Sequence, residues 1–344
     1  MPRPNSPNGR VTATDIARHL GLSVTAVSFV LNDSPHINKV SQRNRERIRA
    51  LAREWNYIPN LVAKSLREQR ANVIGVSFAD LRFGWAHAAL LGMLEVLEPA
   101  GTVPLIAISM WDVKREQQDL RSMLGRQVDG IILTTPNVEN LDTYKAITAS
   151  GVPLVFMGDA LSDHDEFSRV LWDEADAIAA ATEHLIASGH DRLVMLSSDY
   201  DSLTQEMRHA AFLKKLSEHG LDNSPADILR PPRGQSPADA LDHYFKSTKK
   251  PATGLVATND ALAFAALGYC DRNAINVPDD LAVISVGDFE YASHRRMSLS
   301  TVALDRHQLG RRAAEVLARL IDHRPKEPIH ETLERGDVIP RSST

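Results

Sequence analysis

From residue 72 onward, short apolar runs alternate with longer amphipathic segments, and this alternation restricts the fold more than any other feature of the chain. Seven runs have the length and composition of strands, in two series: 73–78, 103–108, 128–133 and 152–157, then 193–196, 254–257 and 281–286. The segments between them have helical periodicity, over 86–99, 114–126, 174–188, 205–219 and 260–273. Strands that alternate with helices form parallel sheets covered on both faces. The predicted fold class is therefore α/β, with two parallel sheets in two similar lobes.

Sheets of this kind bind ligands beyond the carboxyl ends of their strands, where loops present side chains. The cleft between the two lobes is therefore the expected small-molecule site. The chain lacks the patterns GxGxxG, GxxxxGKS/T, HExxH and GxSxG, which favours a binding function over catalysis. Its 13 histidines are scattered. His184 and His190 have no third ligand nearby, so neither a metal nor a cofactor is expected.

The first 60 residues predict three short helices. Thr12 and Asp15 have the spacing of a capping box, which starts a helix over 13–20 that Gly21 ends. Ser23 caps a second helix and Ser41 starts a third. Helical spacing in the second helix separates an inward set, Val24, Val27 and Leu31, from an outward set, Thr25, Ala26, Phe29 and Asn32. Two short helices joined by a tight turn indicate a helix-turn-helix, whose second helix enters the major groove of DNA.

Charge separates this segment from the rest of the chain. The net charge of −5 combines 12 basic and 5 acidic side chains in residues 1–70 with 27 and 39 in residues 71–344. A basic module joined to an acidic domain favours a polyanion as the partner of the N-terminal end. Phe29 adds a second argument, because it places a large apolar ring on the outward face beside small uncharged residues, as contact with base edges requires. The alternative is a small helical bundle whose arginines are solvated.

Composition limits the surroundings of the protein. Hydrophobic residues make up 43% and charged residues 24% of the 344 residues, as in globular domains. Cys270 is the only cysteine, which excludes an intramolecular disulfide and favours a reducing cytoplasm. Residues 1–9 lack the apolar run of a signal peptide, and no stretch reaches the roughly 18 apolar residues of a membrane span. The expected location is the cytoplasm, without a membrane partner.

The segment from Val11 to Asn32, VTATDIARHLGLSVTAVSFVLN, resembles the N-terminal signature of the LacI/GalR family of bacterial transcription regulators. The family's third helix, its exit and its hinge helix are also matched, by residues 40–41, 45–48, 56–60 and 63–67. The resemblance implies a helix-turn-helix headpiece over 1–59, a hinge helix and linker over 60–70, and an effector-binding and dimerisation domain over 71–344.

The resemblance also implies contacts with DNA. Val24, Thr25 and Phe29 would read bases, Ser28 and Asn32 would lie near phosphates, and Leu66 would insert into a minor-groove step, as in other minor-groove binders. The full implied set is Val24, Thr25, Ala26, Ser28, Phe29, Asn32, Leu66 and Arg67. Phe29 departs from the family, which often has Arg or His there, so apolar contact replaces hydrogen bonds to purine edges.

The acidic part of the chain resembles the effector domain of the same family, which is similar to periplasmic sugar-binding proteins. The matching segments are 128–132, 151–153, 184–186, 188–190, 258–260, 277–278 and 309–313. The effector positions that the resemblance implies are Arg82, Phe83, Trp85, Trp172, Asp173, Arg208, Asn259, Asp260 and Asp288. Two positions depart from the family by one residue, because Gly158 precedes Asp159 and Gly287 precedes Asp288.

These residue types suit a carbohydrate. Tryptophan faces stack on the C–H surfaces of sugars, while Asp, Asn and Arg side chains hydrogen-bond to hydroxyls. A nucleoside or another metabolite is the alternative ligand, and Arg82 could select an acid or a phosphate. Packing alone is the alternative role for Trp85 and Trp172.

Together these implications describe a repressor that binds palindromic double-stranded DNA as a homodimer, with half-sites about one helical turn apart, and responds to an effector between its lobes. The first lobe is expected over 71–170 and 300–328, including a helix at 307–321, and the second over 171–299 and 329–344. No heptad-rich tail indicates a tetramer. The alternatives are a stand-alone small-molecule binding protein and an α/β enzyme.

Overall fold

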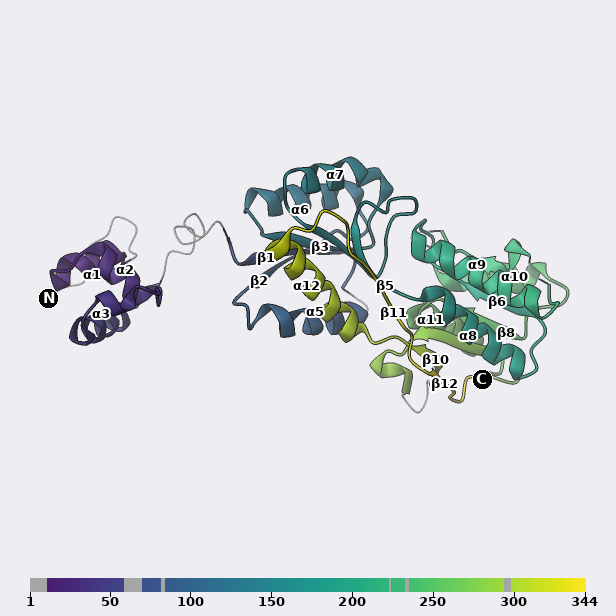
Figure 1. Ribbon diagram of the computed structural model, residues 1–344. Helices are drawn as coiled ribbons and strands as arrows, with labels where there is room; N and C mark the ends of the chain where they lie inside the picture. The colour runs from purple at the N-terminus through teal and green to yellow at the C-terminus, as the bar shows by residue number, and fades with distance from the viewer. Residues whose placement is uncertain (1–10, 59–69, 82–83, 223, 233–234, 294–297) are drawn as a thin grey trace. The chain divides into compact units, whose positions relative to one another are not determined.

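The computed structural model describes residues 11–58, 70–81, 84–222, 224–232, 235–293 and 298–344 (Figure 1). The chain divides into two compact units, residues 1–71 and 72–344. Of the predicted hinge over 60–70, residues 60–69 lie outside the described ranges. Within the described ranges, no helix is both long enough and apolar enough to cross a membrane.

The first unit contains the three predicted helices, α1 (Ala13–Leu20), α2 (Val24–Leu31) and α3 (Gln42–Glu54), with a 3-10 turn, η1 (Ile37–Lys39), before the third. The capping box is confirmed. The Thr12 hydroxyl accepts from the Asp15 amide at 3.2 Å, and the Thr12 amide donates to the Asp15 carboxylate at 3.0 Å. Gly21 ends α1 with a φ of 65°, which glycine adopts without steric cost. Ser23 caps α2 by accepting from the Ala26 amide at 3.1 Å.

The core of this unit corrects the predicted inward face of α2. Val27 and Val30 are buried there, whereas Val24 is 45% exposed. Val24 is the first residue of the helix, so its side chain lies beyond the stripe that α1 and α3 cover. The buried apolar side chains of the unit are Val11, Ile16, Ala17, Val27, Val30, Val40, Ile48, Leu51 and Trp55.

The second unit contains two six-stranded sheets, each at the centre of one lobe. In the first lobe the strand order is β11-β5-β4-β3-β1-β2, and all neighbours are parallel. The strands are β1 (Val73–Phe78), β2 (Val103–Ile108), β3 (Gly130–Thr134), β4 (Leu154–Met157), β5 (Ser168–Trp172) and β11 (His330–Leu333). Figure 1 shows the helices that cover the two faces, α6 (Val113–Gly125) and α7 (Leu141–Ala149) on one and α5 (Gly84–Leu97) and α12 (Arg306–His323) on the other.

The second sheet has the order β12-β10-β9-β8-β6-β7, and only β12 is antiparallel to its neighbour among the described strands. The strands are β6 (Leu193–Leu196), β7 (Ile228–Leu229), β8 (Gly254–Ala257), β9 (Ala282–Gly287), β10 (Ser300–Ala303) and β12 (Val338–Ile339). Helices α8 (Glu174–Ala187) and α9 (Leu203–Glu218) cover one face, and α10 (Pro237–Ser247) and α11 (Asp260–Arg272) cover the other. The predicted α/β class with two parallel-dominated sheets is confirmed.

Two strands lie in the opposite lobe from the one predicted. β10, expected in the first lobe, pairs with β9 in the second, and β11, expected in the second lobe, pairs with β5 in the first. The chain therefore passes between the lobes after β5, after β10 and after β11. Both strands are four residues long and lie at or next to a sheet edge. Their own periodicity is too short to place them, so the neighbouring strand decides where they pair.

The contact between α5 and α12 depends on glycine. A Cβ atom on Gly310 of α12 would lie 1.8 Å from the Ala89 carbonyl oxygen, and one on Gly92 of α5 would lie 1.9 Å from the His307 carbonyl oxygen. The two helices therefore approach until backbone meets backbone. This approach holds the first turn of α12, with Arg306, at the carboxyl edge of the first sheet.

Candidate functional site

A cavity of about 200 Å³ lies at the carboxyl ends of the strands of both sheets. In the first lobe its walls come from the residues that follow β1, β2, β3 and β4, among them Asp80, Trp111, Thr135 and Asp159. In the second lobe they come from the residues that follow β6, β8 and β9, among them Ser198, Asn259 and Phe289. The cavity therefore occupies the position that parallel sheets offer to ligands, and both lobes build it.

Aromatic rings form part of the wall. Trp85 of α5 lines the cavity, and its ring lies 6.0 Å from that of Phe78 at the end of β1. Trp111 lies in the loop after β2, and its ring centre is 5.1 Å from that of Tyr200 in the second lobe. Met110 and Trp111 both have positive φ, 54° and 64°. Such strain in two successive non-glycine residues costs free energy and is commonly retained where a side chain must be positioned.

Asp159 joins the two lobes at the cavity wall. It follows β4 in the first lobe, and its Oδ1 accepts from the Ala160 amide at 2.9 Å and from the Thr204 amide of α9 at 3.3 Å. Its Oδ2 is buried and has no hydrogen-bond partner among the described residues. Burial raises the pKa of Asp159. A ligand that donates to Oδ2 would therefore satisfy a buried oxygen and contact the junction between the lobes at once.

Two arginines line the cavity, and they differ in their partners. The Arg208 guanidinium of α9 is buried and forms a bidentate pair with Glu174, with Nε to Oε2 at 2.9 Å and Nη2 to Oε1 at 3.0 Å. Arg306 is the first residue of α12, and its Nε is buried with no partner among the described residues. Burial lowers the pKa of Arg306. Within the described part of the chain, the first charge is thus compensated by an ion pair and the second is not.

Three of the sequence-predicted effector residues line this cavity: Trp85, Arg208 and Asn259. Asn259 also caps α11, because its side-chain oxygen accepts from the Leu262 amide at 3.0 Å. Arg82 and Phe83 lie outside the described residues. The remaining four, Trp172, Asp173, Asp260 and Asp288, do not line the cavity.

Trp172 and Asp173 were predicted to contact the effector, but the structure gives each of them another role. Trp172 is 1% exposed and packs in the hydrophobic core beneath the first sheet. It lies within β5, so its side chain points into a sheet face that helices cover rather than into a loop. Asp173 caps α8 by accepting from the Asp176 amide at 2.9 Å. Its carboxylate therefore satisfies a helix end, which is the common role of an aspartate at this position.

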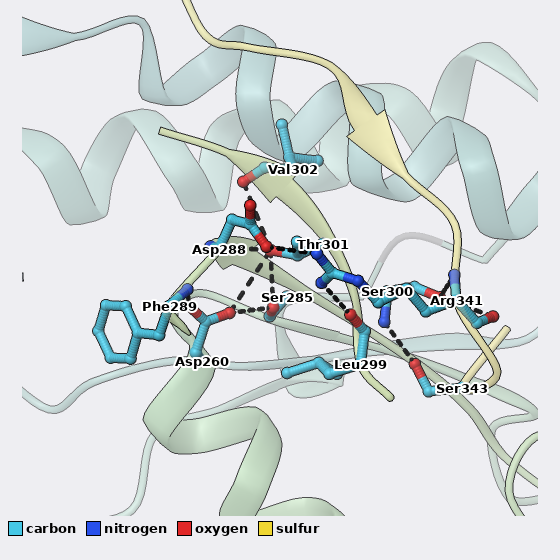
Figure 2. Close-up of polar contacts among 10 residues, drawn as sticks. All are labelled: Asp260, Ser285, Asp288, Phe289, Leu299, Ser300, Thr301, Val302, Arg341 and Ser343. Atoms are coloured by element: carbon cyan, nitrogen blue, oxygen red, sulfur yellow. Dashed lines mark hydrogen bonds and ion pairs between the residues drawn. The ribbon is translucent and has the colours of Figure 1, made fainter. Parts of the chain in front are cut away.

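Asp260 and Asp288 belong to a polar network behind the cavity (Figure 2). Asp260 is fully buried and accepts from the Ser285 hydroxyl and, at 2.7 Å, from the Phe289 amide. Asp288 forms an ion pair of 2.8 Å with Arg341. Gly287 precedes Asp288 with a φ of 152°, and a Cβ there would lie 2.5 Å from the Asp260 carboxylate. The two carboxylates therefore hold the loop after β9 in place, and the side chain of that loop that lines the cavity is Phe289.

Sequence reasoning missed Asp80, Trp111, Thr135, Ser198, Tyr200 and Arg306, which also line the cavity. A signal existed for the first five, since each lies within four residues of the end of a strand at the carboxyl edge. Arg306 had no such signal. The strand that it follows, β10, was not predicted, and Arg306 reaches the cavity because α12 packs against α5.

The candidate DNA-binding helix is α2. Val24 and Thr25 are exposed at its start, and Ala26 is partly buried against the core of the unit. The Asn32 amide donates to the Ser28 hydroxyl at 3.1 Å and to the Ser28 carbonyl at 3.0 Å, so these two side chains contact each other. Phe29 was expected on the outward face of the helix, but its ring is partly buried and lies 5.4 Å from that of His36. The loop after α2 covers it. Leu66 and Arg67 lie outside the described residues.

A helix-turn-helix unit followed by a two-lobed α/β domain with a cavity between its lobes defines a class of DNA-binding regulators with a ligand-binding domain. The sequence model of the lacI family of bacterial regulatory proteins matches residues 12–60, and that of the periplasmic binding protein-like domain matches residues 182–344. The HTH-type transcriptional regulator GntR of Pseudomonas aeruginosa is 30% identical over 98% of this chain and 96% of its own length. The chain belongs to the LacI family of transcriptional regulators.

Solved structures share the fold. The Lac repressor dimer bound to operator and the anti-inducer ONPF matches with a TM-score of 0.83 and 23% identity, over 97% of this chain and 99% of that chain. A complex of the transcriptional regulator CelR with cellobiose matches with a TM-score of 0.73 and 22% identity, over 97% and 100%. These likenesses extend across both units of the chain.

Proposed function

We propose that the protein is a dimeric transcriptional repressor that acts in the cytoplasm on a palindromic operator and is controlled by a small carbohydrate in the interlobe cavity. In this role α2 contacts bases and phosphates through Val24, Thr25, Ala26, Ser28, Phe29 and Asn32. Leu66 of the hinge inserts into the minor groove, and Arg67 also contacts the DNA. The Lac repressor structure, a dimer on its operator, supports the palindromic arrangement.

One observation carries the regulatory part of the proposal, namely that the wall of the cavity contains contacts between the lobes. Asp159 of the first lobe accepts from the Thr204 amide at the start of α9. The Trp111 ring contacts the Tyr200 ring across the same cavity. A ligand in the cavity touches both sets of contacts, so its binding free energy differs between lobe arrangements. Such a difference is what couples a ligand to a second site.

A carbohydrate is the ligand that the walls favour. Trp85 and Trp111 offer ring faces, and Asp159 and Asn259 offer oxygen acceptors for hydroxyls. The complex of CelR with cellobiose pairs a protein of the same fold with a sugar. A nucleoside is the competing ligand, and binding measurements against both classes separate them.

Selection of bound fragments from random DNA tests the DNA-binding part. The full-length protein should recover a two-fold symmetric sequence, and an active ligand should change the yield. Val24→Asp should abolish recovery, because it places a carboxylate on an exposed position of α2. Val138→Asp makes the same change at a valine that is 61% exposed in the second unit, and it should leave recovery unchanged. Recovery of no symmetric sequence would contradict the proposal.

A further inference from the structure

The cavity is lined by an arginine, Arg306, that is partly buried and forms no ion pair within the described part of the chain. Arg306 Nε is buried and has no partner among those residues. Arg208, in the same cavity, shows the usual arrangement, since Glu174 engages it through two hydrogen bonds. Buried charges in proteins are normally paired, because an unpaired one loses its hydration without replacement. The buried Nε of Arg306 has no such partner among the described residues, and Arg306 lines the cavity.

The nearby acids are engaged elsewhere. The negative charges that act on Arg306 through space include Glu174 and Asp260. Glu174 is committed to Arg208, and Asp260 accepts from the Ser285 hydroxyl and the Phe289 amide. Asp159 is held at the lobe junction by the Ala160 and Thr204 amides. Glu174 and Asp260, the acids that act on Arg306, therefore have other partners and leave its guanidinium available to a ligand.

We propose that the effector is an anionic carbohydrate whose carboxylate or phosphate group pairs with Arg306. This inference rests on the proposed function of the cavity as the effector site. A guanidinium is planar and presents parallel N–H groups, so it binds carboxylate and phosphate oxygens in a bidentate manner. The hydroxyls of the same ligand donate to Asp159 Oδ2, a buried oxygen without a partner among the described residues. Trp85 and Trp111 flank the sugar ring.

The arrangement also accounts for the two acids in the wall. A cavity lined only by Arg306 would suit an inorganic anion, whereas Asp80 and Asp159 line the same cavity. Carboxylates repel a small anion but accept from hydroxyls. The combination of an uncompensated cation with acceptor groups therefore matches a ligand that has an acid at one end and hydroxyls at the other.

Isothermal titration of the full-length protein tests the inference with three sets of ligands. The first set contains carboxylates, D-gluconate, D-glucuronate and D-galacturonate. The second contains the 6-phosphates of D-glucose and D-gluconate, and the third contains the neutral parents D-glucose and D-galactose. We expect a member of the first or second set to bind. Binding from the first set identifies the acidic group of the effector as a carboxylate, and binding from the second identifies it as a phosphate. Binding by neutral sugars alone, or by no acidic sugar, would overturn the inference.

Variants connect the result to Arg306. Arg306→Gln should weaken the acidic ligand about 10- to 100-fold, the worth of a charge-assisted hydrogen bond, and Arg306→Lys should lie between this variant and the wild type. Arg319→Gln is the matched control, because Arg319 lies on the same helix with a side chain that is 57% exposed, and it should bind as the wild type does. Equal affinity of Arg306→Gln and the wild type for the acidic ligand would refute the role of Arg306.

The unliganded protein provides a readout that does not depend on the ligand chosen. Because the Nε of Arg306 is buried without a partner among the described residues, Arg306→Met should leave the midpoint of thermal unfolding unchanged or raise it, and a drop of several degrees would contradict the argument. Operator binding by the wild type is measured in parallel. If no acidic sugar binds but the operator does, the proposed ligand is wrong and the repressor proposal stands. If the operator does not bind, the repressor proposal is wrong.

Discussion

At the scale of single residues, Asp260 and Asp159 show how a carboxyl that stabilises the fold differs from one that is available to bind a ligand. Asp260 is fully buried, and both of its oxygens accept from the chain, one from Ser285 and the other from the Phe289 amide. Asp159 is almost as buried, but its Oδ2 has no partner among the described residues. Sequence likeness favoured Asp260, since it sits in the Asn-Asp pair of the family. The hydrogen bonds made by each carboxylate oxygen, which only the structure provides, favour Asp159 as the residue that contacts a ligand.

Asp159→Asn tests how much the ionisation of this buried carboxyl lowers the stability of the folded protein. Burial raises the pKa of Asp159 in the folded protein above its unfolded value of 3.8. The folded state therefore binds the proton more tightly, and wild-type stability falls as pH rises from about 3.8 through the folded pKa. Asn avoids this loss and keeps an oxygen for the two amides. At pH 7 the variant should be more stable, by about 1.4 kcal/mol for each unit of pKa elevation.

Urea unfolding of wild type and Asp159→Asn across pH 4 to 8 measures this effect. The difference in free energy of unfolding should grow with pH and then level off. Asp239→Asn, at an exposed position in the first turn of α10, serves as the control and should track the wild type. A variant that is less stable than the wild type at pH 7 would show that the ionised carboxylate stabilises the fold.

At the scale of elements, local signals were sufficient for the headpiece helices and for the longer strands, whereas α7 and α10 were not predicted. The capping box at Thr12 and the glycine after α1 set the limits of the first helix as predicted. The strands β1 and β2 begin and end at the predicted residues. The strands not predicted, β5, β7, β10, β11 and β12, have two to five residues. Such strands are too short to show periodicity and exist because a neighbour offers hydrogen bonds to their backbones.

Gly310→Ala tests the contact that positions α12. The new methyl group would lie 1.8 Å from the Ala89 carbonyl oxygen, so α5 and α12 must separate. We expect the free energy of unfolding to fall by about 1–3 kcal/mol or more, as for other overpacked sites. Affinity for the effector should also fall, because Arg306 and Leu309, which line the cavity, lie on the same helix within about one turn of Gly310.

A second glycine of a helix gives the matched control. A Cβ atom added to Gly125 of α6 would meet no other atom within 4 Å. Gly125→Ala should therefore raise the free energy of unfolding by about 0.5–1 kcal/mol through the lower backbone entropy of alanine in the unfolded chain. Equal effects of the two substitutions in urea unfolding would mean that α5 and α12 tolerate separation.

At the scale of the whole molecule, the net charge of −5 separates into a basic N-terminal part and an acidic remainder. The basic part attracts phosphates and releases counterions, whereas the acidic part is repelled by the duplex. This asymmetry favours contact with DNA through the first unit. It also makes operator affinity depend strongly on salt.

Raising the salt concentration from about 50 to about 200 mM should lower operator affinity by about 10³-fold, the loss typical of about six phosphate contacts.

Phe29→Ala should reduce the preference for operator over random DNA without changing the salt dependence of affinity, since its ring carries no charge. Arg43→Gln, at an exposed position of α3, should make that dependence weaker. Fluorescence anisotropy with labelled operator measures both quantities, and an operator affinity that does not respond to salt would contradict a phosphate-binding headpiece.

The class of protein could be established from the order of the amino acids. Helix caps, strand–helix alternation and the headpiece signature depend on residues close together in the chain, so local interactions are enough to define them. Which side chains meet in the cavity depended on the folded chain. Trp111 and Tyr200 come from different lobes, and Arg306 arrives through the packing of α12 on α5. Whether a buried charge is compensated depends on every group around it. For that reason the sequence could not distinguish the paired Arg208 from Arg306, whose Nε has no partner among the described residues.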